Sequence, residues 1–453
     1  MAIALDGAYP DDEPPGDLAA QYGLTPFGGR FEPQAERLLS LTDAYLRAAS
    51  NSVPGSFAAR TARRDGQPLT DSPVVHAADL DADFRIVKES FSRITANAEA
   101  AMEYFFSRLF VHYPEIRSMF PHAMRDHMEH VFAALAHIVW SIDSPEALTA
   151  YLVRLGRGHR KFGVKERHYD PFLTVLAETV RHFSGSYWTG QCEAAWAAAL
   201  GHVSSVMLAA ARQDAALQPA WWIGEVVQHD QRCQDLAVLT IRPDQRLHYL
   251  PGQYLAVQVP RWPRLWRNFS IANAPRENGL IDLHVRAVRG GMVSCSLVRG
   301  MRPGDTLLLG QACGDMTAPA DHDRDLLCIA GGTGLAPLKA IIEEAISARR
   351  PGRRRKITLF FGARTEEDLY DLADLRVLEW IDPSLTVIPV VSQQPRFDGI
   401  KGMLPEVAAR YANCAGAEVF ISGPDRMVAK TVRLLASRSQ AGHIRHDPPG
   451  SAI

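Results

Sequence analysis

The hydrophobic pattern of this 453-residue chain changes its period twice, and these changes constrain the fold more than any other feature of the sequence. Residues 83 to about 215 carry apolar side chains at helical spacing, whereas from about Gln218 short segments alternate between polar and apolar residues. From about Asp321, apolar strand patterns alternate with helical ones. Because 453 residues is also long for a single core, the sequence predicts several domains of different class.

The sequence divides into four predicted regions. They are an N-terminal extension with one helix and a linker (1–82), an all-α domain (83–216), an antiparallel β-barrel (217–319) and a doubly wound parallel α/β domain (320–453). The predicted fold class is therefore multidomain and combines α, β and α/β architectures. The apolar stripe of the N-terminal helix, residues 32–49, favours docking on the following domain, and residues 50–75 are interpreted as a linker.

Charge and composition exclude several function classes. The 49 lysines and arginines nearly balance the 51 acidic residues, so bulk charge indicates neither nucleic-acid binding nor association with a membrane surface. No apolar run approaches the roughly 18 residues that cross a bilayer, and the N-terminus lacks a cationic start, so we expect a cytoplasmic protein without a membrane span. The six cysteines form no CxxC pair, which argues against zinc, iron–sulfur and disulfide chemistry.

Two short signals lie close together in the predicted barrel. RNFS occupies residues 267–270, and GGMVS, residues 290–294, opens a short helix. The alternating segment between them predicts a half-buried strand with His284 on its polar face. A basic residue at a strand end and backbone amides at a glycine-opened helix N-terminus suit a pyrophosphate. An ordinary loop-to-helix turn with Ser294 as its cap is the alternative.

A second glycine loop begins the last domain. The apolar strand pattern at residues 326–330 runs into GGTG, residues 331–334, and a helix opens near Pro337. Glycines at this place let a ligand phosphate approach the helix N-terminus. A purely structural turn is the alternative.

Nine histidines lie in the predicted helical domain, which raises the question of haem binding. Most of them are expected to be ordinary surface or core residues. His159 stands out near the end of an amphipathic helix, and His127 lies on an earlier helix, seven residues after Phe120. This placement leaves room for a prosthetic group between the two helices.

The helical domain resembles a globin, specifically the globin half of a flavohaemoglobin, in the ordered segments FFSRLFVHYPEIRSMFP, LGRGHRKFGVKERHY and AWAAALGHVSSVML. The resemblance implies that His159 is the axial iron ligand and that Phe120 wedges against the haem. It places His127 and Phe106 on the distal side. Tyr169 matches the tyrosine that, with a glutamate, forms a network around the proximal histidine in that family.

The globin resemblance has two departures that bear on chemistry. Flavohaemoglobins usually carry a distal tyrosine where this chain has Phe106, so Tyr104 and His127 are the available hydrogen-bond donors. The glutamate position on the last helix falls in the segment LAAARQ, residues 208–213, so the proximal network is expected to be incomplete. Both changes weaken the features that activate bound oxygen.

The predicted barrel resembles the flavin-binding barrel of the ferredoxin-NADP reductase superfamily, which carries Arg-x-Tyr-Ser and Gly-x-x-Ser at these places. The resemblance implies that Arg267 and Ser294 hold the FAD pyrophosphate and that Ser270 faces the flavin ring. The family tyrosine is Phe269 here, which keeps a ring to stack and loses the hydroxyl. The other residues that it places at the flavin site are Gly290, Gly291 and Val293.

The last domain resembles the nicotinamide domain of the same superfamily in three ordered motifs. They imply dinucleotide phosphates at Gly331, Gly332, Thr333 and Gly334, the adenosine ribose at Arg364 and Thr365, and the nicotinamide near Ser422, Gly423 and Pro424. In the closing C-terminal strand, Asp447 matches an acidic residue of the family, and Pro448 replaces an aromatic one.

The expected cofactors are therefore haem b, FAD and NADH. NADPH is disfavoured because Glu366, Glu367 and Asp368 would repel a 2′-phosphate. The basic run at residues 349–356 is interpreted as a solvated helix end that compensates the helix dipole.

The order globin, flavin barrel and dinucleotide domain implies electron flow from NADH through FAD to haem iron. The leading hypothesis is a flavohaemoglobin that acts as a nitric oxide dioxygenase, with O2 and NO as its small-molecule partners. A first alternative is a divergent, type II-like flavohaemoglobin that uses another electron donor, such as a 2-hydroxy acid. A second is a haem-based gas sensor.

Overall fold

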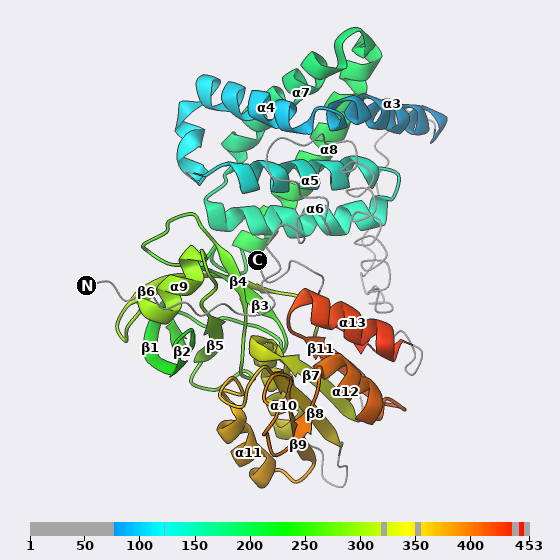
Figure 1. The fold of residues 1–453 in the computed structure, drawn as a ribbon. Coiled ribbons are helices and arrows are strands. Elements are labelled where there is room, and N and C mark those ends of the chain that lie inside the picture. The colour runs from blue at the N-terminus through cyan, green and yellow to red at the C-terminus, as the bar shows by residue number, and fades with distance from the viewer. Residues whose placement is uncertain (1–76, 122, 319–323, 349–354, 437–443, 448–453) are drawn as a thin grey trace, which may run out of the picture. The chain divides into compact units, whose positions relative to one another are not determined.

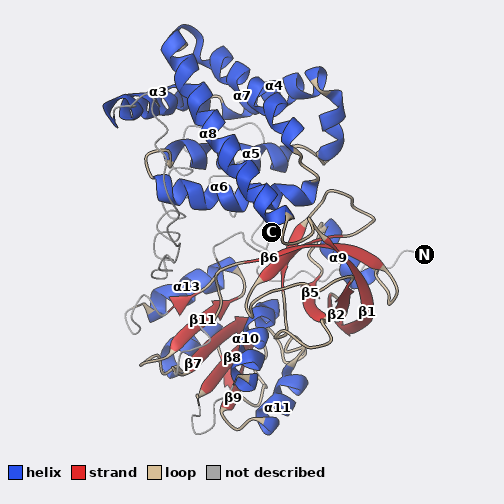
Figure 2. Cartoon of the chain, turned by 180° about the vertical axis from the view of Figure 1, so that it is seen from behind, coloured by secondary structure: helices blue, strands red, loops and turns tan. Residues whose placement is uncertain are grey.

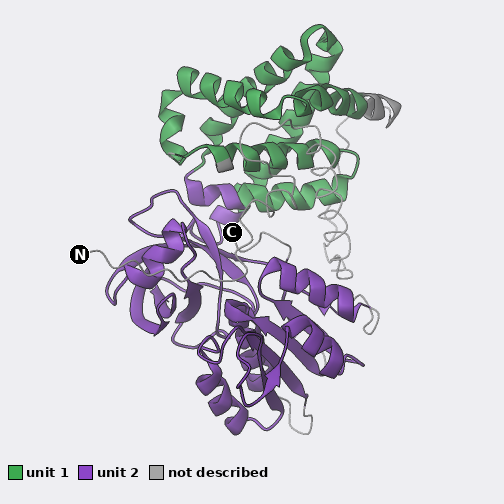
Figure 3. Ribbon diagram, in the orientation of Figure 1, with its two compact units in different colours: residues 1–157, 164–213 green, residues 158–163, 214–453 purple. Residues whose placement is uncertain are grey.

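The computed structural model describes residues 77–121, 123–318, 324–348, 355–436 and 444–447 (Figure 1). The predicted N-terminal helix and linker lie outside the described residues, as do Pro448 and most of the basic run at 349–356. The chain forms two compact units, residues 1–157 with 164–213 and residues 158–163 with 214–453 (Figure 3).

The first unit is built from helices. They are α3 (Ala77–Thr95), α4 (Ala98–His112), α5 (Arg125–Trp140), the greater part of α6 (Pro145–His159), α7 (Tyr169–Ser184) and most of α8 (Gly190–Ala215). Large side chains such as Phe91, Phe105 and Leu152 are fully buried in its core. A Cβ atom at Gly156 would lie 2.3 Å from the carbonyl oxygen of Met207, so α6 and α8 meet backbone to backbone where only glycine fits.

Two features of these helices differ from the sequence pattern. The predicted start of the all-α domain at residue 83 lies inside α3, which begins at Ala77. Among the described helices, α8 alone is long and apolar enough by length and composition to cross a bilayer, although the sequence pattern suggested no such run. Its alanines raise the hydropathy, and Trp196 on this helix is buried and donates to Ser90 Oγ at 2.8 Å. A core helix meets the same criterion.

The second unit begins with an antiparallel sheet (Figure 2). Its strands are β1 (Trp222–Cys233), β2 (Leu236–Pro243), β3 (Tyr254–Gln258), β4 (Arg267–Ser270), β5 (Ile281–Arg286) and β6 (Thr306–Cys313), in the order β4-β3-β6-β1-β2-β5. An antiparallel bridge between Ile271 and Leu283 joins the two ends of this order and closes the barrel. The short helix α9 (Met292–Arg299) buries Leu297 and Val298 in the barrel core.

A parallel sheet follows. Its strands are β7 (Leu326–Gly331), β8 (Ile357–Ala363), β9 (Leu385–Val391), β10 (Ile400–Lys401), β11 (Glu418–Ser422) and β12 (Ile444–Arg445), in the order β10-β9-β8-β7-β11-β12. The helices are α10 (Leu335–Ser347), α11 (Leu372–Ile381), α12 (Leu404–Tyr411) and α13 (Asp425–Leu435). The strand order reverses direction between β7 and β11, which is where doubly wound sheets bind ligands. The predicted fold class is confirmed.

The polar face of β5 is covered, contrary to the expectation of a half-buried strand. His284 is only 6% exposed, and its Nδ1 lies 2.8 Å from the hydroxyl of Tyr370, which belongs to the parallel-sheet domain. Arg286 pairs with Asp235 at 2.8 Å and with Asp368 at 3.4 Å. β5 does alternate between polar and apolar residues, but the parallel-sheet domain covers its polar face.

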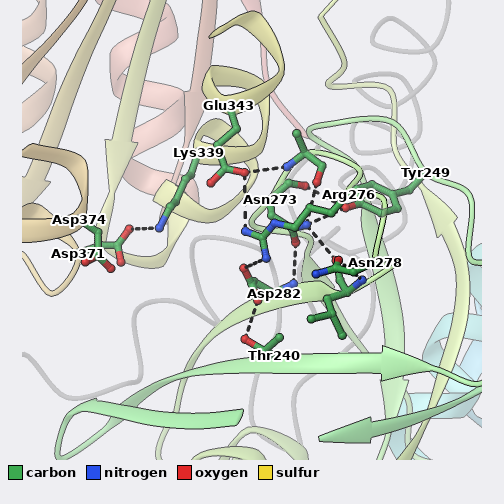
Figure 4. A network of polar contacts seen from close by, with 12 residues as sticks. Thr240, Tyr249, Asn273, Arg276, Asn278, Asp282, Lys339, Glu343, Asp371 and Asp374 are labelled. Atoms are coloured by element: carbon green, nitrogen blue, oxygen red, sulfur yellow. Dashed lines mark hydrogen bonds and ion pairs between the residues drawn. The ribbon is translucent and has the colours of Figure 1, made fainter. Parts of the chain in front are cut away.

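A polar network joins the barrel to the parallel-sheet domain (Figure 4). Glu343 of α10 accepts a hydrogen bond from the backbone N–H of Ala274 at 3.0 Å, and Arg276 lies between Asp282 at 2.8 Å and Glu343 at 3.9 Å. Lys339 donates to the fully buried carboxylate of Asp371 at 2.7 Å. Because buried polar groups are costly to separate from their partners, this network holds the two domains in one arrangement.

We expect the reductase unit to lose stability in acid through His284. Burial lowers the pKa of this imidazole from 6.5 to about 3, so below pH 6.5 the unfolded chain binds a proton that the folded chain does not. The contribution of His284 to the free energy of unfolding is fully present above pH 6.5. It falls with the pH, and about 2 kcal/mol is lost at pH 5. Urea unfolding followed by flavin fluorescence at pH 7.5 and pH 5 measures this loss. In His284→Phe the difference between the two pH values should shrink by that amount, and an unchanged difference would contradict the assignment.

Candidate functional site

An aromatic cluster fills the centre of the first unit. Phe106 on α4 is 3% exposed, and its ring centroid lies 5.5 Å from that of Phe120 and 6.1 Å from that of His127 on α5. Phe120 and His127 are 5.1 Å apart, and Phe110 packs against both phenylalanines. The structure therefore brings together Phe106 and His127, which were predicted for the distal side of a haem, and Phe120, which was predicted to wedge against it. An apolar wall with one imidazole fits a porphyrin.

Arg117 fixes the position of Phe120. This arginine lies in η1 (Pro114–Met119), and its guanidinium donates to the carbonyl oxygens of Phe120 at 3.2 Å and of Pro121 at 3.0 Å. It also lies 5.1 Å from the ring centroid of Phe110, in cation–π geometry. The turn after η1 therefore holds the Phe120 ring against the cluster.

Tyr104 is not a distal hydrogen-bond donor, so that expectation was wrong. Its ring stacks on His182 of α7 at 4.4 Å and meets Phe183 at 5.9 Å. Residues two apart on a helix point to nearly opposite sides, so Tyr104 and Phe106 cannot share a pocket. Of the two donors proposed from sequence, only His127 stands beside Phe106.

The predicted proximal residues lie at helix ends. His159 is the last residue of α6, and Tyr169 is the first of α7, where burial raises the pKa of its phenol. Residues 208–213 of α8 hold no carboxylate, as the sequence indicated. One carboxylate missed by sequence reasoning is Asp214, which is buried and pairs with Arg160, the residue after His159. Asp214 lies in an alanine-rich segment without a motif, so the local sequence did not indicate that it is buried or paired.

The predicted flavin cradle is formed by β4 and the turn into α9. Gly290 has φ 78° and open space where a Cβ would lie, so its backbone can approach a ligand. A Cβ at Gly291 would lie 2.4 Å from Ser294 Oγ and 2.5 Å from Val288 Cγ2, so these side chains would have to shift to admit one. Trp262 Nε1 donates to Ser296 Oγ at 3.1 Å and so ties the loop before β4 to α9. These features fit a pyrophosphate between a strand and a helix N-terminus.

Several residues of the predicted flavin cradle also contact other parts of the barrel. Ser294 Oγ donates to Gly291 O at 3.2 Å and accepts from Val288 N at 3.4 Å, so it ties α9 to the preceding turn, but the N-cap is Gly291 and not Ser294 as the alternative expected. The Val293 side chain is buried in the barrel core, so only its backbone N–H can face a ligand. Phe269 and Ser270 pair with Leu255 and Tyr254 on β3.

The two glycine loops of the predicted nucleotide site meet at the switch point of the parallel sheet. Gly332 has φ 55° and open space at its Cβ position. A Cβ at Gly334 would lie 2.3 Å from the carbonyl oxygen of Ser422, and one at Gly331 would lie 3.3 Å from Pro424 Cδ. Gly423 has φ 151° and lies against Gly331. The predicted phosphate and nicotinamide loops are thus packed together at the carboxyl ends of β7 and β11, which suits a dinucleotide.

The third nucleotide motif follows β8. Arg364 is exposed, and its carbonyl oxygen accepts from Gln393 N at 2.8 Å. Thr365 Oγ1 donates to Asp368 at 3.3 Å, and Asp368 also pairs with Arg286. The negative charge of Asp368 is therefore partly balanced, and Glu366 and Glu367 are the acidic residues left exposed at this position.

The described end of the basic run lies far from these loops within the sheet. Lys356 immediately precedes β8, and its backbone N–H donates to Asp325, just before β7, at 2.9 Å. The Arg355 guanidinium donates to the carbonyl oxygen of Arg324. These residues are at the amino ends of the strands, whereas nucleotides bind at the carboxyl ends. This placement disfavours a 2′-phosphate site there.

Asp447 lies after β12, in the part of the predicted closing strand that the structure describes. Burial and the nearby Asp315 carboxylate raise its pKa from 3.8 to about 6. Its Oδ1 lies 3.6 Å from the place of a Cβ on Gly314, beside the ring of Tyr254. β12 pairs in parallel with β11, as the sequence predicted for a closing strand.

Comparisons with known proteins identify the three domains. Residues 103–207 match the globin family, residues 224–317 the oxidoreductase FAD-binding domain and residues 328–433 the oxidoreductase NAD-binding domain. A flavohaemoprotein of Bordetella pertussis is 28% identical over 289 residues, which cover 59% of this chain and 71% of that protein. The chain is therefore a globin domain fused to FAD-binding and NAD-binding oxidoreductase domains, and a flavohaemoprotein is among the proteins similar to it.

Other relatives share the reductase part or the fold. The electron transfer component of xylene/toluene monooxygenase from Pseudomonas putida is 32% identical over 218 residues, 47% of this chain and 61% of that protein. The flavohaemoglobin of Malassezia yamatoensis, solved with FAD and haem, covers 81% of this chain and 96% of its own, at 17% identity and a TM-score of 0.63. The predicted combination of a globin with FAD-binding and NAD-binding domains is confirmed.

Proposed function

We propose that this chain is a flavohaemoglobin that passes electrons from NADH through FAD to haem iron and uses them as a nitric oxide dioxygenase, which converts NO and O2 to nitrate. The observation that carries the proposal is that one chain holds an aromatic pocket with an imidazole, a glycine-opened cradle on a barrel and a glycine loop at a sheet switch point. Flavin chemistry connects the hydride of NADH, which carries two electrons, to iron, which accepts one.

The residues of this chain would divide the work among the three sites. Gly331, Gly332 and Gly334 let the nucleotide phosphates approach the N-terminal end of α10, and Ser422 lies beside that loop. Arg267 and the backbone at Gly290 would hold the FAD pyrophosphate. The aromatic cluster would exclude water from a bound haem, and His159 would bind its iron.

The decisive experiment is an absorbance measurement on the purified holoprotein. NADH added without oxygen should bleach the flavin and convert the haem to its ferrous form, and NADPH should do so more slowly because Glu366 and Glu367 are exposed at the predicted ribose site. In air, the reduced protein should consume NO in proportion to NADH. A haem that stays ferric under NADH, or an absence of NADH-dependent NO consumption, would refute the proposal.

We expect His127 to hold bound dioxygen. Among the described residues of the cluster around Phe106, it is the one that carries a hydrogen-bond donor in its side chain. His127→Leu should speed dioxygen dissociation by about tenfold, which corresponds to one hydrogen bond of roughly 1.4 kcal/mol. Flash photolysis measures the rate. His130→Leu, an exposed position on the same helix, is the control, and equal rates in both variants would assign His127 another role.

A second candidate keeps the same flavohaem architecture with a different electron donor, such as a 2-hydroxy acid. The replacement of the family's distal tyrosine by Phe106, which is buried among phenylalanines, favours a reaction that needs less stabilisation of dioxygen. Flavin reduction by a panel of 2-hydroxy acids, compared with NADH in the same assay, separates the two. A gas sensor would instead show ordinary ligand affinity with slow turnover for every donor.

We also propose, from charge balance and composition, a cytoplasmic protein that acts on small molecules and binds no nucleic acid.

A further inference from the structure

The turn that follows His159 belongs to the second compact unit. Residues 158–163 group with residues 214–453 (Figure 3). The turn contains η2 (Arg160–Phe162) and ends at Gly163, which has φ 75° and whose N–H donates to Arg160 O at 2.9 Å. Side chains of three successive residues in this turn contact other parts of the same unit.

Arg160 anchors the turn to the chain segment before β1. Its guanidinium donates to the carboxylate of Asp214 and to the carbonyl oxygen of Gln218 at 2.8 Å. The two charged side chains are 12% and 5% exposed, and the Gln218 side chain also donates to Asp214 at 2.8 Å. Because a buried ion pair with its hydrogen bonds satisfied is costly to break, Arg160 fixes the turn in place.

Lys161 and Phe162 both reach Trp266. The rings of Phe162 and Trp266 meet edge to face, with centroids 6.5 Å apart and planes at 83°. The Lys161 ammonium lies 5.7 Å from the Trp266 ring centroid and 5.2 Å from that of Phe162, within the range of cation–π attraction. Trp266 directly precedes Arg267, the basic residue of the flavin cradle. The turn after the axial histidine therefore rests on the residue next to the flavin cradle.

The loop that carries Trp266 is held rigidly. Trp262 donates through its indole N–H to Ser296 on α9 at 3.1 Å, and the Leu265 N–H donates to Trp262 O at 3.3 Å. Arg264 has φ 68°, a left-handed conformation that no other non-glycine residue among those described adopts, and its N–H donates to the side chain of Gln258. A strained backbone that the surroundings hold in place is typical of sites where position matters.

We propose that Trp266 is a positioning residue that couples the flavin site to the proximal turn of the globin, by seating Phe162 and Lys161 against the neighbour of Arg267. The inference rests on the proposed function, since it requires FAD at the cradle and haem iron at His159. Each transfer across this contact moves one electron from reduced flavin to ferric iron. Two such transfers return the flavin to its oxidised form with release of its proton.

One described connection between the two predicted sites lies within this unit. From His159 to Phe162 the route runs along three residues, then crosses one ring contact to Trp266, and Arg267 follows. Electron transfer slows steeply when packed atoms along such a route are replaced by a gap. Removal of the indole should therefore affect the flavin-to-haem step and spare the NADH-to-flavin step, which depends on the glycine loops of β7 and β11.

The test is anaerobic stopped-flow reduction of the full-length holoprotein by NADH. Flavin bleaching and haem reduction are followed at their separate absorbance bands. Trp266→Leu should slow haem reduction by about tenfold or more, as misplacement of a reacting group does, while flavin bleaching changes by less than about twofold. Trp266→Phe keeps a ring and should retain most of the rate. Trp380→Leu, an 85% exposed tryptophan on α11, is the control.

Each other outcome overturns the inference. If Trp266→Leu reduces its haem at the wild-type rate, the contact carries no coupling. If flavin bleaching slows by the same factor, or FAD is lost, Trp266 serves flavin binding instead. If the unaltered protein fails to reduce its haem with NADH at all, the proposed function fails before any variant is compared, so the two failures are distinguishable.

A measurement without turnover completes the test. Amide hydrogen exchange of a peptide that covers residues 158–163 reports how firmly the turn is held. Trp266→Leu should speed exchange in this peptide and leave peptides of β7 and β8 unchanged. Unaltered exchange at 158–163 would show that Trp266 does not position the turn.

Discussion

Replacement of His159 by glycine should release haem from the protein, with a fall in haem affinity of roughly 100-fold or more. Loss of outer partners alone typically costs 10- to 100-fold in metal affinity, and this change removes the predicted iron ligand itself. His159 is the last residue of α6, so glycine there costs roughly 1 kcal/mol in helix propensity at most, and the helix should survive. Haem absorbance after gel filtration, measured against protein concentration, gives the result. NADH should still bleach the flavin of this variant.

The matched control is His202→Gly on α8. This histidine is exposed, and the change costs roughly 1 kcal/mol in helix propensity. It should keep its haem. Added imidazole should restore haem absorbance to His159→Gly, because the free ligand can enter the space that the side chain leaves. Full haem occupancy in His159→Gly without imidazole would assign the axial position to another residue.

The sequence predicted what local patterns encode. Glycine-rich turns, helical periods and strand alternation are properties of a few adjacent residues, so the loop at Gly331 to Gly334 and the order of the helices and strands were predicted correctly. A family resemblance also predicted Phe106, Phe120 and His127 for the haem pocket. The structure places their ring centroids within 6.1 Å of one another, and their role at haem stays a prediction.

Long-range partners account for what the sequence missed. His284 occupies a polar position of the alternating pattern, where an exposed side chain is expected. In the structure it is buried and contacts Tyr370, which lies 86 positions later in the chain. Asp368 was counted as a charge facing the nucleotide, yet Arg286 from another domain partly balances it. Tyr104 had the right chemistry for a distal donor, but its helix turns it toward His182. In each case the chemistry of the side chain was predicted correctly, but its environment depends on a segment far away in the sequence.

The Arg160–Asp214 ion pair, next to the predicted iron ligand His159, also could not be predicted from the local sequence. Arg160 lies in the segment that resembles a globin, but Asp214 belongs to no motif, and 54 positions separate the two residues. Their pairing places the turn after His159 in the reductase unit, where Phe162 meets Trp266. The order of the domains suggested that electrons pass from flavin to haem. The proposal that Trp266 links the two sites rests on the packing of these side chains within the reductase unit.

The Gly334→Ala change should abolish reduction of the flavin by NADH and leave FAD and haem bound. An alanine Cβ would lie 2.3 Å from Ser422 O and 2.5 Å from Gly423 N, both backbone atoms, so the loops at the ends of β7 and β11 would have to separate. Misplacement of a reacting group by about 1 Å can cost about 100-fold in rate, and a loss of that size is expected for hydride transfer.

The measurement is the rate of anaerobic flavin bleaching at saturating NADH, with dithionite as a reductant that needs no nucleotide site. Dithionite should reduce flavin and haem in Gly334→Ala as in the unaltered protein, because the cradle at Gly290 and the aromatic cluster lie on other elements. Gly416→Ala is the control in the same domain. Its φ of 70° makes alanine strained there by roughly 1 kcal/mol, but its Cβ would meet nothing within 4 Å. If NADH bleaches the flavin of Gly334→Ala at the same rate as that of Gly416→Ala, the close approach of the two loops is not needed for hydride transfer.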